Sequence, residues 1–518
     1  MEILKTNIQM NKLGRPVVDQ FAIDEDYNVP DSKADIGRII SGEGKIKIEE
    51  MKKLENYIRI SGKLQFKILY VTDTTEPTLS SLEGRIPFEE MVYVEDVKLD
   101  SDYIVQVSRV DFSASLIHSR KISIKTIVDL IVHSERMQEE QAATDMEGEL
   151  FKKKRMLNVL QLNISKKDIC RIREEIEIPG TKENIGSVIW NDISLRKVDT
   201  KLIQDALEVK GELMVFCFYE SQEGKMDWVE QPVSFEGKIE CPGADAGCYH
   251  HVYHQMSDAN VEVRMDQDGE MRVIGIEGIL DMRILVYEEQ KMEFLEDAYS
   301  LREQCILEKE RTGYEELIMQ NHSKCKINEH LQLPEVRDEI LQICHSGGSM
   351  QIEKMEMTKD GIAIEGILHV NFLYVKENDR VPFDMWQGMI PFSYLLECPS
   401  ENGEKMYDIT YNLEQIAVDL AGNGEVEIKA VLAFQSFIRS TVELDNIKAC
   451  KMEKFDKEML EKRPGIVGYI VKKGDELWDL AKRNYTTEES IMTVNNLESK
   501  ELKEGQKILI FRENMSIL

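Results

Sequence analysis

The 518-residue sequence has little of what marks secreted, membrane-spanning or nucleic-acid-binding proteins. Residues 1–21 contain no continuous apolar segment of the kind that signal peptides carry. No window reaches the roughly 18 apolar residues that a membrane span needs. Lys and Arg number 65 against 96 Asp and Glu, and the net charge of −31 argues against a nucleic-acid partner, because phosphate contacts need a basic surface. We interpret the acidity as a solubility feature, with an acidic face for a basic partner as the alternative.

The nine cysteines form an odd and scattered set, without the even framework of a disulfide-rich domain. Such cysteine usage is typical of a reducing cytosol, so we expect a cytoplasmic protein. A composition with 42% hydrophobic and 31% charged residues is that of a globular chain, and the length allows three or four domains.

Signatures of catalysis are also missing. The chain has no GxSxG and no HExxH motif, and SGEGK at 41–45 lacks the spacing of a phosphate-binding loop, so a turn explains it better. Carboxylates are too numerous for a catalytic pair to be singled out. We therefore expect neither an enzyme nor a cofactor site.

Potential metal ligands are concentrated in one stretch, residues 241–254. Thiolates and imidazoles suit zinc, but Cys-x6-Cys followed by adjacent histidines is not a familiar zinc spacing. We expect loop residues here rather than a metal site, with zinc as the alternative. The residues concerned are Cys241, Cys248, His250, His251 and His254.

Three long stretches share one alternating pattern. Each has apolar residues at every second position, a glycine at its midpoint and a tyrosine eight residues after that glycine. A proline precedes each glycine by 32 residues. Alternation of this length predicts a β-strand with one buried face, and the shared spacing predicts three tandem modules. The stretches are 58–70, 207–219 and 362–374, with Gly62, Gly211 and Gly366 at their midpoints.

Each module ends in a second alternating strand, centred on Thr126, Gly278 or Ala430. A small residue within so long a strand suggests a bend or bulge, and two long strands suggest two packed sheets. After the proline of module 1, isoleucines at nearly helical spacing (36, 39 and 40) predict a short helix, and the other modules have a similar pattern. The overall prediction is a mainly β chain of three sandwich-like modules followed by a smaller domain.

Composition divides the chain into seven segments. Two polar stretches predict linker helices, and a charged stretch predicts a further linker. The predicted boundaries are 1–134 for module 1 with its N-terminal extension, 135–157 for a linker helix, 158–300 for module 2, 301–317 for a second linker helix, 318–444 for module 3, 445–466 for the charged linker and 467–513 for the terminal domain.

The terminal segment has the pattern strand, helix, helix, strand. Asp475 is placed to cap the first helix, and Thr486 with Glu489 predicts a capping box for the second. Trp478 lies on the apolar face of the first helix and is either a core aromatic or an anchor for a partner.

This segment resembles a LysM domain in Tyr469-x-Val471, Gly474-Asp475, Leu477-Trp478 and Gly505-Gln506. The resemblance implies a βααβ fold that binds N-acetylglucosamine glycans in a groove between two loops. A carboxylate stands at position 476, where a small hydroxyl residue is usual. On this chain the residues of the implied partner or glycan groove are Gly474, Asp475, Glu476, Leu477, Trp478, Asn495, Asn496 and Leu497.

The stretches at 29–39 and 60–71 resemble the repeats called SPOCS, and three such modules before one LysM domain is similar to the SipL-type spore coat morphogenetic proteins. The resemblance implies a non-enzymatic assembly scaffold in the mother cell, at the forespore surface. It implies binding to the coat morphogenetic ATPase (stage IV sporulation protein A) through the LysM domain, with other coat proteins as further partners. The alternatives are a peptidoglycan-binding protein of the cell wall or spore cortex and, third, a cytosolic enzyme with a metal in module 2.

Overall fold

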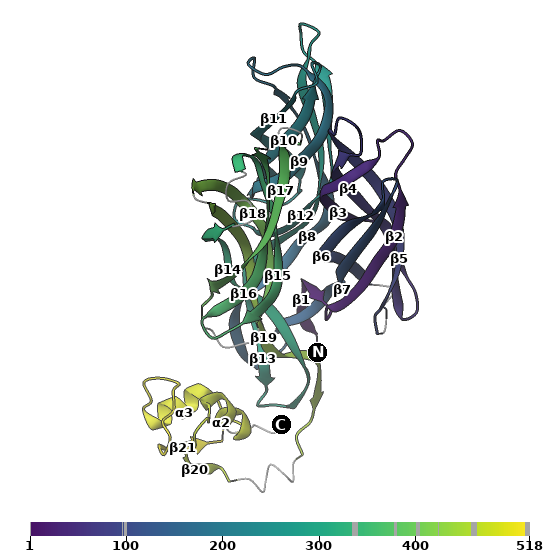
Figure 1. Ribbon diagram of the computed structural model, residues 1–518. Helices are drawn as coiled ribbons and strands as arrows, with labels where there is room; N and C mark the ends of the chain where they lie inside the picture. Colours follow the sequence, from purple (N-terminus) through teal and green to yellow (C-terminus); the bar gives the residue numbers. More distant parts are fainter. Residues whose placement is uncertain are drawn as a thin grey trace.

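Figure 1 shows the computed structural model, which describes residues 2–95, 97, 101–333, 340–377, 381–399, 405–422, 424–456 and 464–512. Strands make up 77% of the structure and helices 3%, and two helices lie between strands in the terminal domain. The predicted fold class, three β-rich modules followed by a small βααβ domain, is confirmed. Among the described residues, no helix is long and apolar enough to cross a membrane.

Module 1 consists of two antiparallel sheets around one core. One sheet has the order β1-β7-β2, with β6 also paired to β7, and the other has the order β3-β4-β5. Side chains from facing strands, including Ile23, Phe66 and Ile124, fill the space between the sheets. The strands are β1 (Ile3–Leu13), β2 (Val17–Asn28), β3 (Ile36–Lys53), β4 (Tyr57–Thr72), β5 (Leu79–Tyr93), β6 (Asp102–His118) and β7 (Lys121–Met146).

Modules 2 and 3 repeat this arrangement. Their sheets have the orders β11-β10-β9 and β12-β13-β8 in module 2, and β15-β16-β17 and β14-β19-β18 in module 3. The strands are β8 (Phe151–Glu177), β9 (Ile185–Ile203), β10 (Ala206–Ser221), β11 (Met226–Glu240), β12 (Tyr249–Met265), β13 (Met271–Tyr299), β14 (Gln304–Gln332), β15 (Ile340–Met357), β16 (Gly361–Lys376), β17 (Phe383–Glu397), β18 (Lys405–Gly422) and β19 (Glu425–Glu453).

The glycine at the midpoint of each repeated strand lies beside a bulge in the neighbouring strand. The register of β3 against β4 shifts between Ile48, which pairs with Gly62, and Glu50. A Cβ atom on Gly62 would stand 2.2 Å from the carbonyl oxygen of Lys47, and one on Gly366 would stand 2.4 Å from that of Gln351. At Gly62 and Gly366 the bulge brings the neighbouring backbone too close for any side chain, and at Gly211 the ring of Phe235 occupies that space.

Both predicted linker helices are wrong, because these residues are strands. Residues 135–146 complete β7 and pair with β1, residues 151–157 begin β8, and residues 304–317 begin β14 and pair with the end of β19. Their polar composition reflects ribbons with one solvated face, and pairing with a strand far away in the sequence outweighs the local helix propensity. The predicted charged linker is strand up to Glu453, and its residues 457–463 lie outside the described residues.

The short helix predicted after the first proline is also wrong, because β3 begins at Ile36. Ile36 is buried in the core of module 1 and its backbone pairs with Thr72, so the near-helical spacing of the isoleucines comes from a strand with two bulges. The corresponding stretch of module 2 is β9. In module 3, residues 334–339 lie outside the described residues and β15 begins at Ile340.

The three modules meet at one end through a shared apolar core, which we call the apex junction. Equivalent residues, seven positions after the midpoint glycines, lie together there: Leu69, Phe218 and Leu373. At the apex junction each module also contacts each of the other two directly. Lys67 of module 1 lies 4.7 Å from the ring of Trp190 in module 2, and Gln387 of module 3 donates a 3.1 Å hydrogen bond to Ser41 of module 1.

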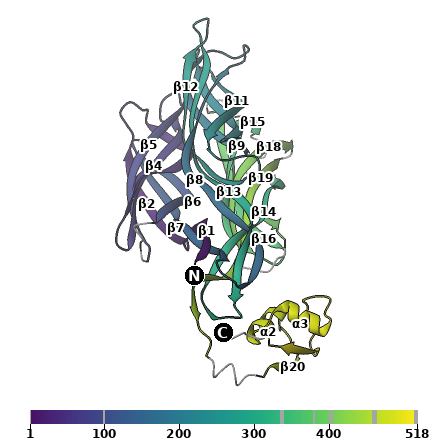
Figure 2. The ribbon, with the colours of Figure 1, turned by 180° about the vertical axis from the view of Figure 1, so that it is seen from behind.

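The contact between modules 2 and 3 at the apex junction is made by His345, whose ring stacks on Phe216 with centroids 4.1 Å apart. The residue eleven positions after the repeat proline makes the contact in each case: Ser41, Trp190 or His345. Each module therefore uses the same position to contact the preceding module of the ring. The three modules therefore close into a ring with approximate threefold symmetry inside one chain. Figure 2 shows the three sets of strands side by side.

Beyond the sandwiches, the long strands continue as three two-stranded ribbons that pack together. The ribbons are β1 with β7, β8 with β13, and β14 with β19. Their inward side chains form one core that takes Ile8 from the first ribbon, Phe294 from the second and Tyr314 from the third. Asn446 of β19 accepts a 3.0 Å hydrogen bond from the Ala143 amide of β7, which ties module 3 to module 1 again.

Where the ribbons leave the sandwiches, the modules meet through buried charges, and we call this place the neck junction. Arg439, which is 1% exposed, donates to Glu315 at 2.8 Å and to Asp408 at 2.7 Å. Arg283 of module 2 forms an ion pair with Glu135 of module 1. Burial alone would raise the pKa of Asp408, but Arg439 and its other neighbours lower it, so this carboxylate stays ionised.

Candidate functional site

The terminal domain consists of β20 (Ile466–Ile470), α2 (Leu477–Arg483), α3 (Glu488–Asn495) and β21 (Lys507–Phe511). Both predicted helix caps are displaced. The N-cap of α2 is Glu476, because the Asp475 carboxylate instead accepts from the Lys472 amide at 2.8 Å and the Tyr469 hydroxyl at 2.9 Å. The N-cap of α3 is Thr487, which accepts from Ser490, one residue after the predicted capping box at Thr486 and Glu489.

The first loop of the predicted groove contributes few accessible side chains. Gly474 is exposed at φ +88°, a conformation that favours glycine, and it makes the turn that brings Asp475 back onto Tyr469. Glu476 is exposed and forms a 2.5 Å ion pair with Lys153 of β8. Leu477 is 1% exposed and belongs to the core of the terminal domain.

The second loop of the predicted groove is held by backbone contacts. The Asn495 side chain accepts from the Leu509 amide and donates to the Leu509 carbonyl, both at 2.7 Å, so it fastens α3 to β21. Asn496 ends α3 in the left-handed conformation and is exposed, and Leu497 packs against the domain core. Gly474, Glu476 and Asn496 are therefore the exposed members of the predicted groove set.

Trp478 lies at a contact between the terminal domain and the ribbon of module 2. Its indole nitrogen donates a 2.8 Å hydrogen bond to Asp297 of β13, and its ring meets that of Tyr299 edge-on, with centroids 4.9 Å apart. Lys482 donates to both carboxylate oxygens of Asp297 at 2.7 Å. Burial alone would raise the pKa of Asp297, but Lys482 and Trp478 lower it.

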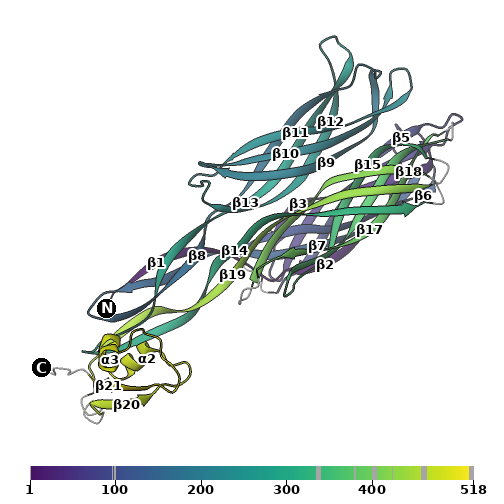
Figure 3. The same ribbon diagram turned by 90° about the vertical axis from the view of Figure 1, so that its left-hand side faces the viewer.

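These contacts dock the terminal domain on the tips of the ribbons. Figure 3 shows the domain beside the ends of β8 and β19. Lys309 of β14 also reaches Asp297, at 3.2 Å, so modules 2 and 3 both contribute to the dock. Of the two roles considered for Trp478, the structure shows a buried aromatic, and it is buried partly by the chain's own ribbon.

The outer face of the β20–β21 sheet is exposed, and its side chains are apolar except for Lys507. Side chains alternate across the two strands, so Ile508 and Ile510 point into the domain core. On the opposite face, Ile466 pairs with Phe511, and Ile470 and Leu509 lie beside them. These four side chains, which we call the outer sheet face, are 58%, 38%, 58% and 49% exposed. Sequence reasoning missed this face, although alternating apolar residues in a two-stranded sheet already point to it.

The candidate metal ligands of module 2 point in different directions. Cys241 is fully buried in the module core, and Cys248 packs against that core. His250 hydrogen-bonds to the Thr200 hydroxyl at 3.0 Å, whereas His251, next to it on β12, faces Tyr253 on the other side of the strand. Burial lowers the pKa of both His251 and His254 to about 4. Within the described part of the chain, no group of three or more His, Cys, Asp or Glu is placed to hold a metal ion.

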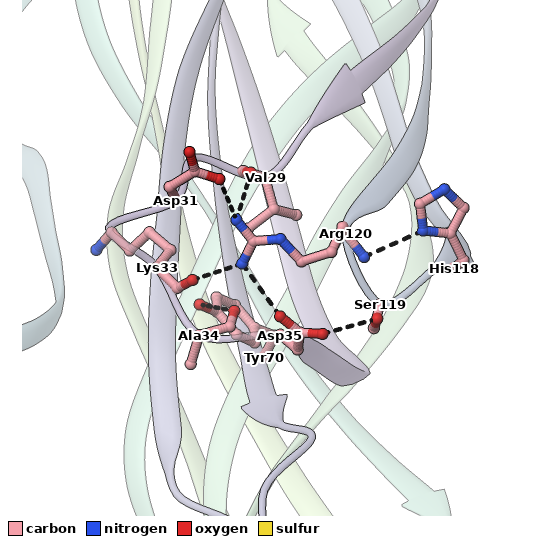
Figure 4. Close-up of polar contacts among 9 residues, drawn as sticks. All are labelled: Val29, Asp31, Lys33, Ala34, Asp35, Tyr70, His118, Ser119 and Arg120. Carbon is pink, nitrogen blue, oxygen red and sulfur yellow. Dashed lines mark hydrogen bonds and ion pairs between the residues drawn. The ribbon is translucent and has the colours of Figure 1, made fainter.

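The loop after the first repeat proline is held by Arg120, as Figure 4 shows. Its guanidinium donates to the carbonyls of Val29 and Lys33, at 2.9 and 2.7 Å, and to the Asp35 carboxylate at 3.1 Å. Arg272 of module 2 holds the equivalent loop through the carbonyls of residues 178, 179 and 182.

These two arginines form what we call the loop clamp, which sequence reasoning also missed. Each lies six residues before the small residue at the centre of its long strand, Thr126 or Gly278, and this shared offset is the signal that could have found them. The equivalent position of module 3 is Gly424.

The chain matches two protein families. The SipL, SPOCS domain matches at residues 35–117, 184–267 and 339–421, and the LysM domain matches at 469–511. The chain has the SipL architecture of three SPOCS domains and a C-terminal LysM domain. Both families are non-catalytic binding domains, and they associate this chain with sporulation and the spore coat. Comparisons with curated proteins and with solved structures found no match.

Proposed function

We propose that this chain is a non-enzymatic scaffold of spore coat assembly, which acts in the mother cell at the forespore surface. The three SPOCS domains form the body, and the LysM domain is the docking module for the coat morphogenetic ATPase, stage IV sporulation protein A. Other coat proteins are further partners of the SPOCS domains. The observation that carries the proposal is the outer sheet face of the LysM domain, because exposed contiguous apolar side chains favour a protein partner.

The docked position of the LysM domain supports the same choice. Trp478 and Leu477 are buried, so a partner meets the outer sheet face without displacing the contact with Asp297. Substitutions at Trp478 or Leu477 would disturb the domain core and the dock together, and loss of binding there would not locate the contact. The outer sheet face offers a cleaner test.

Purified wild-type chain and Ile466→Asp should be compared for binding to the ATPase. Ile466 is 58% exposed and lies opposite Phe511, so the substitution leaves the fold intact and places a charge without a cross-strand partner on the outer sheet face. We expect affinity to fall at least tenfold, because a desolvated charge without a partner is costly at an interface. Met389→Asp on β17, where the side chain is 67% exposed, is the matched control and should bind within twofold of wild type. Wild-type affinity for Ile466→Asp would contradict the proposed contact.

Peptidoglycan binding is the second candidate function, and the exposed groove residues Gly474 and Asn496 favour it. A glycan bound in the groove would contact Glu476. The ion pair between Glu476 and Lys153 of β8 places the ribbon at one side of the groove. Sedimentation with purified peptidoglycan separates the two functions. Retention on peptidoglycan without binding to the ATPase would reverse the ranking.

A further inference from the structure

Two cysteine sulfurs lie in contact at the tip of the β14–β19 ribbon. Cys305 Sγ of β14 and Cys450 Sγ of β19 are 3.2 Å apart, although the two residues are 145 positions apart in the sequence. Both residues are half-buried. In the ladder, Cys305 pairs with Met452 and Leu307 pairs with Cys450, so the two cysteines are diagonal neighbours on the same face.

We propose that Cys305 and Cys450 are a modification site, a dithiol that peroxide oxidises to a disulfide across the ribbon tip. The sulfurs need to move about 1.2 Å closer to reach the S–S bond length of about 2.05 Å. A peroxide is the co-reactant, and the reaction uses two thiols and one hydrogen peroxide. Both sulfurs are oxidised, and the two peroxide oxygens are reduced and leave as two waters.

The reaction proceeds in two displacement steps. One cysteine, as its thiolate, attacks a peroxide oxygen, forms a sulfenic acid and releases hydroxide, which takes up the thiol proton as water. The second sulfur then attacks the sulfenic sulfur, the S–S bond forms, and the sulfenic oxygen leaves with the second thiol proton as the second water. Because the partner sulfur is already in contact, the second step is intramolecular and competes well against further oxidation.

The surroundings of Cys305 explain why it persists as a thiol without an oxidant. Burial, with a further contribution from the hydrogen bond to Cys450, raises the pKa of Cys305 to about 12. The thiolate fraction of Cys305 is therefore small at neutral pH, and its oxidation is slow unless peroxide is supplied. The ribbon core beside Cys450, with Leu307 and Ile447, is apolar and keeps the strand ends together.

The disulfide would fix the ribbon tip on which the LysM domain docks. Lys309, four residues after Cys305 on β14, reaches the same Asp297 that binds Trp478 and Lys482. A covalent bond between β14 and β19 restrains this edge against fraying and closes a loop of 145 residues, so the oxidised form should unfold at a higher temperature than the reduced form.

The test uses the full chain, incubated with hydrogen peroxide in its native state, then denatured, alkylated and analysed by mass spectrometry. We expect two of the nine free thiols to become inaccessible, one peptide pair linking Cys305 to Cys450, and reversal by dithiothreitol. Peroxide should raise the melting temperature of wild type, and this rise should vanish in Cys305→Ser and in Cys450→Ser.

Cys325→Ser is the matched control, because Cys325 is half-buried on the same strand and lies opposite Leu432. This variant should still form the linked peptide and show the rise in melting temperature. Two results would overturn the proposal. One is oxidation of Cys305 and Cys450 to separate sulfinic acids in wild type, and the other is nine alkylated thiols after peroxide treatment that oxidises a reference dithiol.

Discussion

The apex junction and the neck junction join the same three modules by different chemistry. At the apex junction, Leu69, Phe218 and Leu373 pack as an apolar core with His345 at its edge. At the neck junction, buried Arg439 lies between carboxylates of module 3, against Tyr287 of module 2. Apolar contacts are tolerant of small shifts, whereas a buried arginine with two carboxylates accepts few geometries. The comparison suggests that the apex junction supplies adhesion and the neck junction sets how the modules are aligned.

Breaking the neck junction should have the largest effect. Arg439→Met leaves Asp408 and Glu315 buried without their cation, and we expect a loss of about 3–5 kcal/mol in the free energy of unfolding, measured in urea. The control is Arg311→Met, because Arg311 forms an exposed ion pair with Glu443 on the same ribbon and should cost less than about 1 kcal/mol. Equal losses for the two variants would show that the neck junction has no special weight.

The buried His345 of the apex junction predicts a pH dependence of stability. Burial alone would lower the pKa of His345, but hydrogen bonds with Asp192 and Glu230 raise it to about 9. Since an unfolded histidine has a pKa of about 6.5, the stabilisation of about 3 kcal/mol is complete below that pH and is lost as pH rises through 9. The difference in unfolding free energy between wild type and His345→Asn should therefore shrink between pH 6.5 and pH 9.5. A constant difference would mean that His345 is not charged in the folded chain.

The loop clamp is present in modules 1 and 2, whereas module 3 has Gly424 at the equivalent position. Loss of the clamp should have an intermediate effect on the free energy of unfolding. Arg120→Ala removes hydrogen bonds to two loop carbonyls and to the carboxylates of Asp31 and Asp35, so we expect a loss of about 1–3 kcal/mol. Arg272→Ala should behave alike. Hydrogen exchange at the Lys33 amide, which donates to the Pro30 carbonyl, reports the loop directly and should speed up in Arg120→Ala only. An unchanged exchange rate at Lys33 in Arg120→Ala would show that other contacts hold the loop in place.

The dock of the LysM domain should show the smallest effect on stability. Asp297→Ala removes the buried acceptor of Trp478 and Lys482. Because the side chains of Lys482 and Lys309 are 35% and 32% exposed and can turn to solvent, we expect a loss of only about 1 kcal/mol. Because the pKa of Asp297 is lowered in the folded chain, the dock is stabilised above the ordinary aspartate pKa of about 3.9 and is lost as pH falls below it. Small-angle scattering at pH 7 should show a larger radius of gyration for Asp297→Ala than for Asp281→Ala, an exposed residue of the same strand. Identical scattering curves would contradict the docked arrangement.

Local pattern was enough to predict the repeated strands and the terminal domain, because their information is contained in short windows. Alternation around Gly62 predicted β4, and the spacing of Gly474 to Trp478 predicted the LysM domain. The linker helices failed for the opposite reason. Residues 135–146 are strand because they pair with β1, more than a hundred residues earlier, and no window contains both partners.

The contacts formed between modules could not be predicted from short sequence windows either. His345 finds its two carboxylates in module 2, and Trp478 finds Asp297 nearly two hundred residues earlier in the chain. Sequence reasoning weighed Trp478 as a core residue or a partner anchor, and did not consider a ribbon of the same chain as the surface that covers it. The alternating pattern could have predicted the outer sheet face, because Ile466, Ile470 and Leu509 occupy the positions opposite the core.

The three SPOCS domains close into one ring, with module 3 returning to module 1. A photo-reactive amino acid at position 41 tests this ring most directly, because Gln387 of module 3 donates to Ser41 at 3.1 Å. Illumination of the intact monomer, followed by peptide mapping, should yield a cross-link from position 41 to residues of β17. Cross-links confined to module 1, in a sample whose module 1 is folded, would contradict the ring.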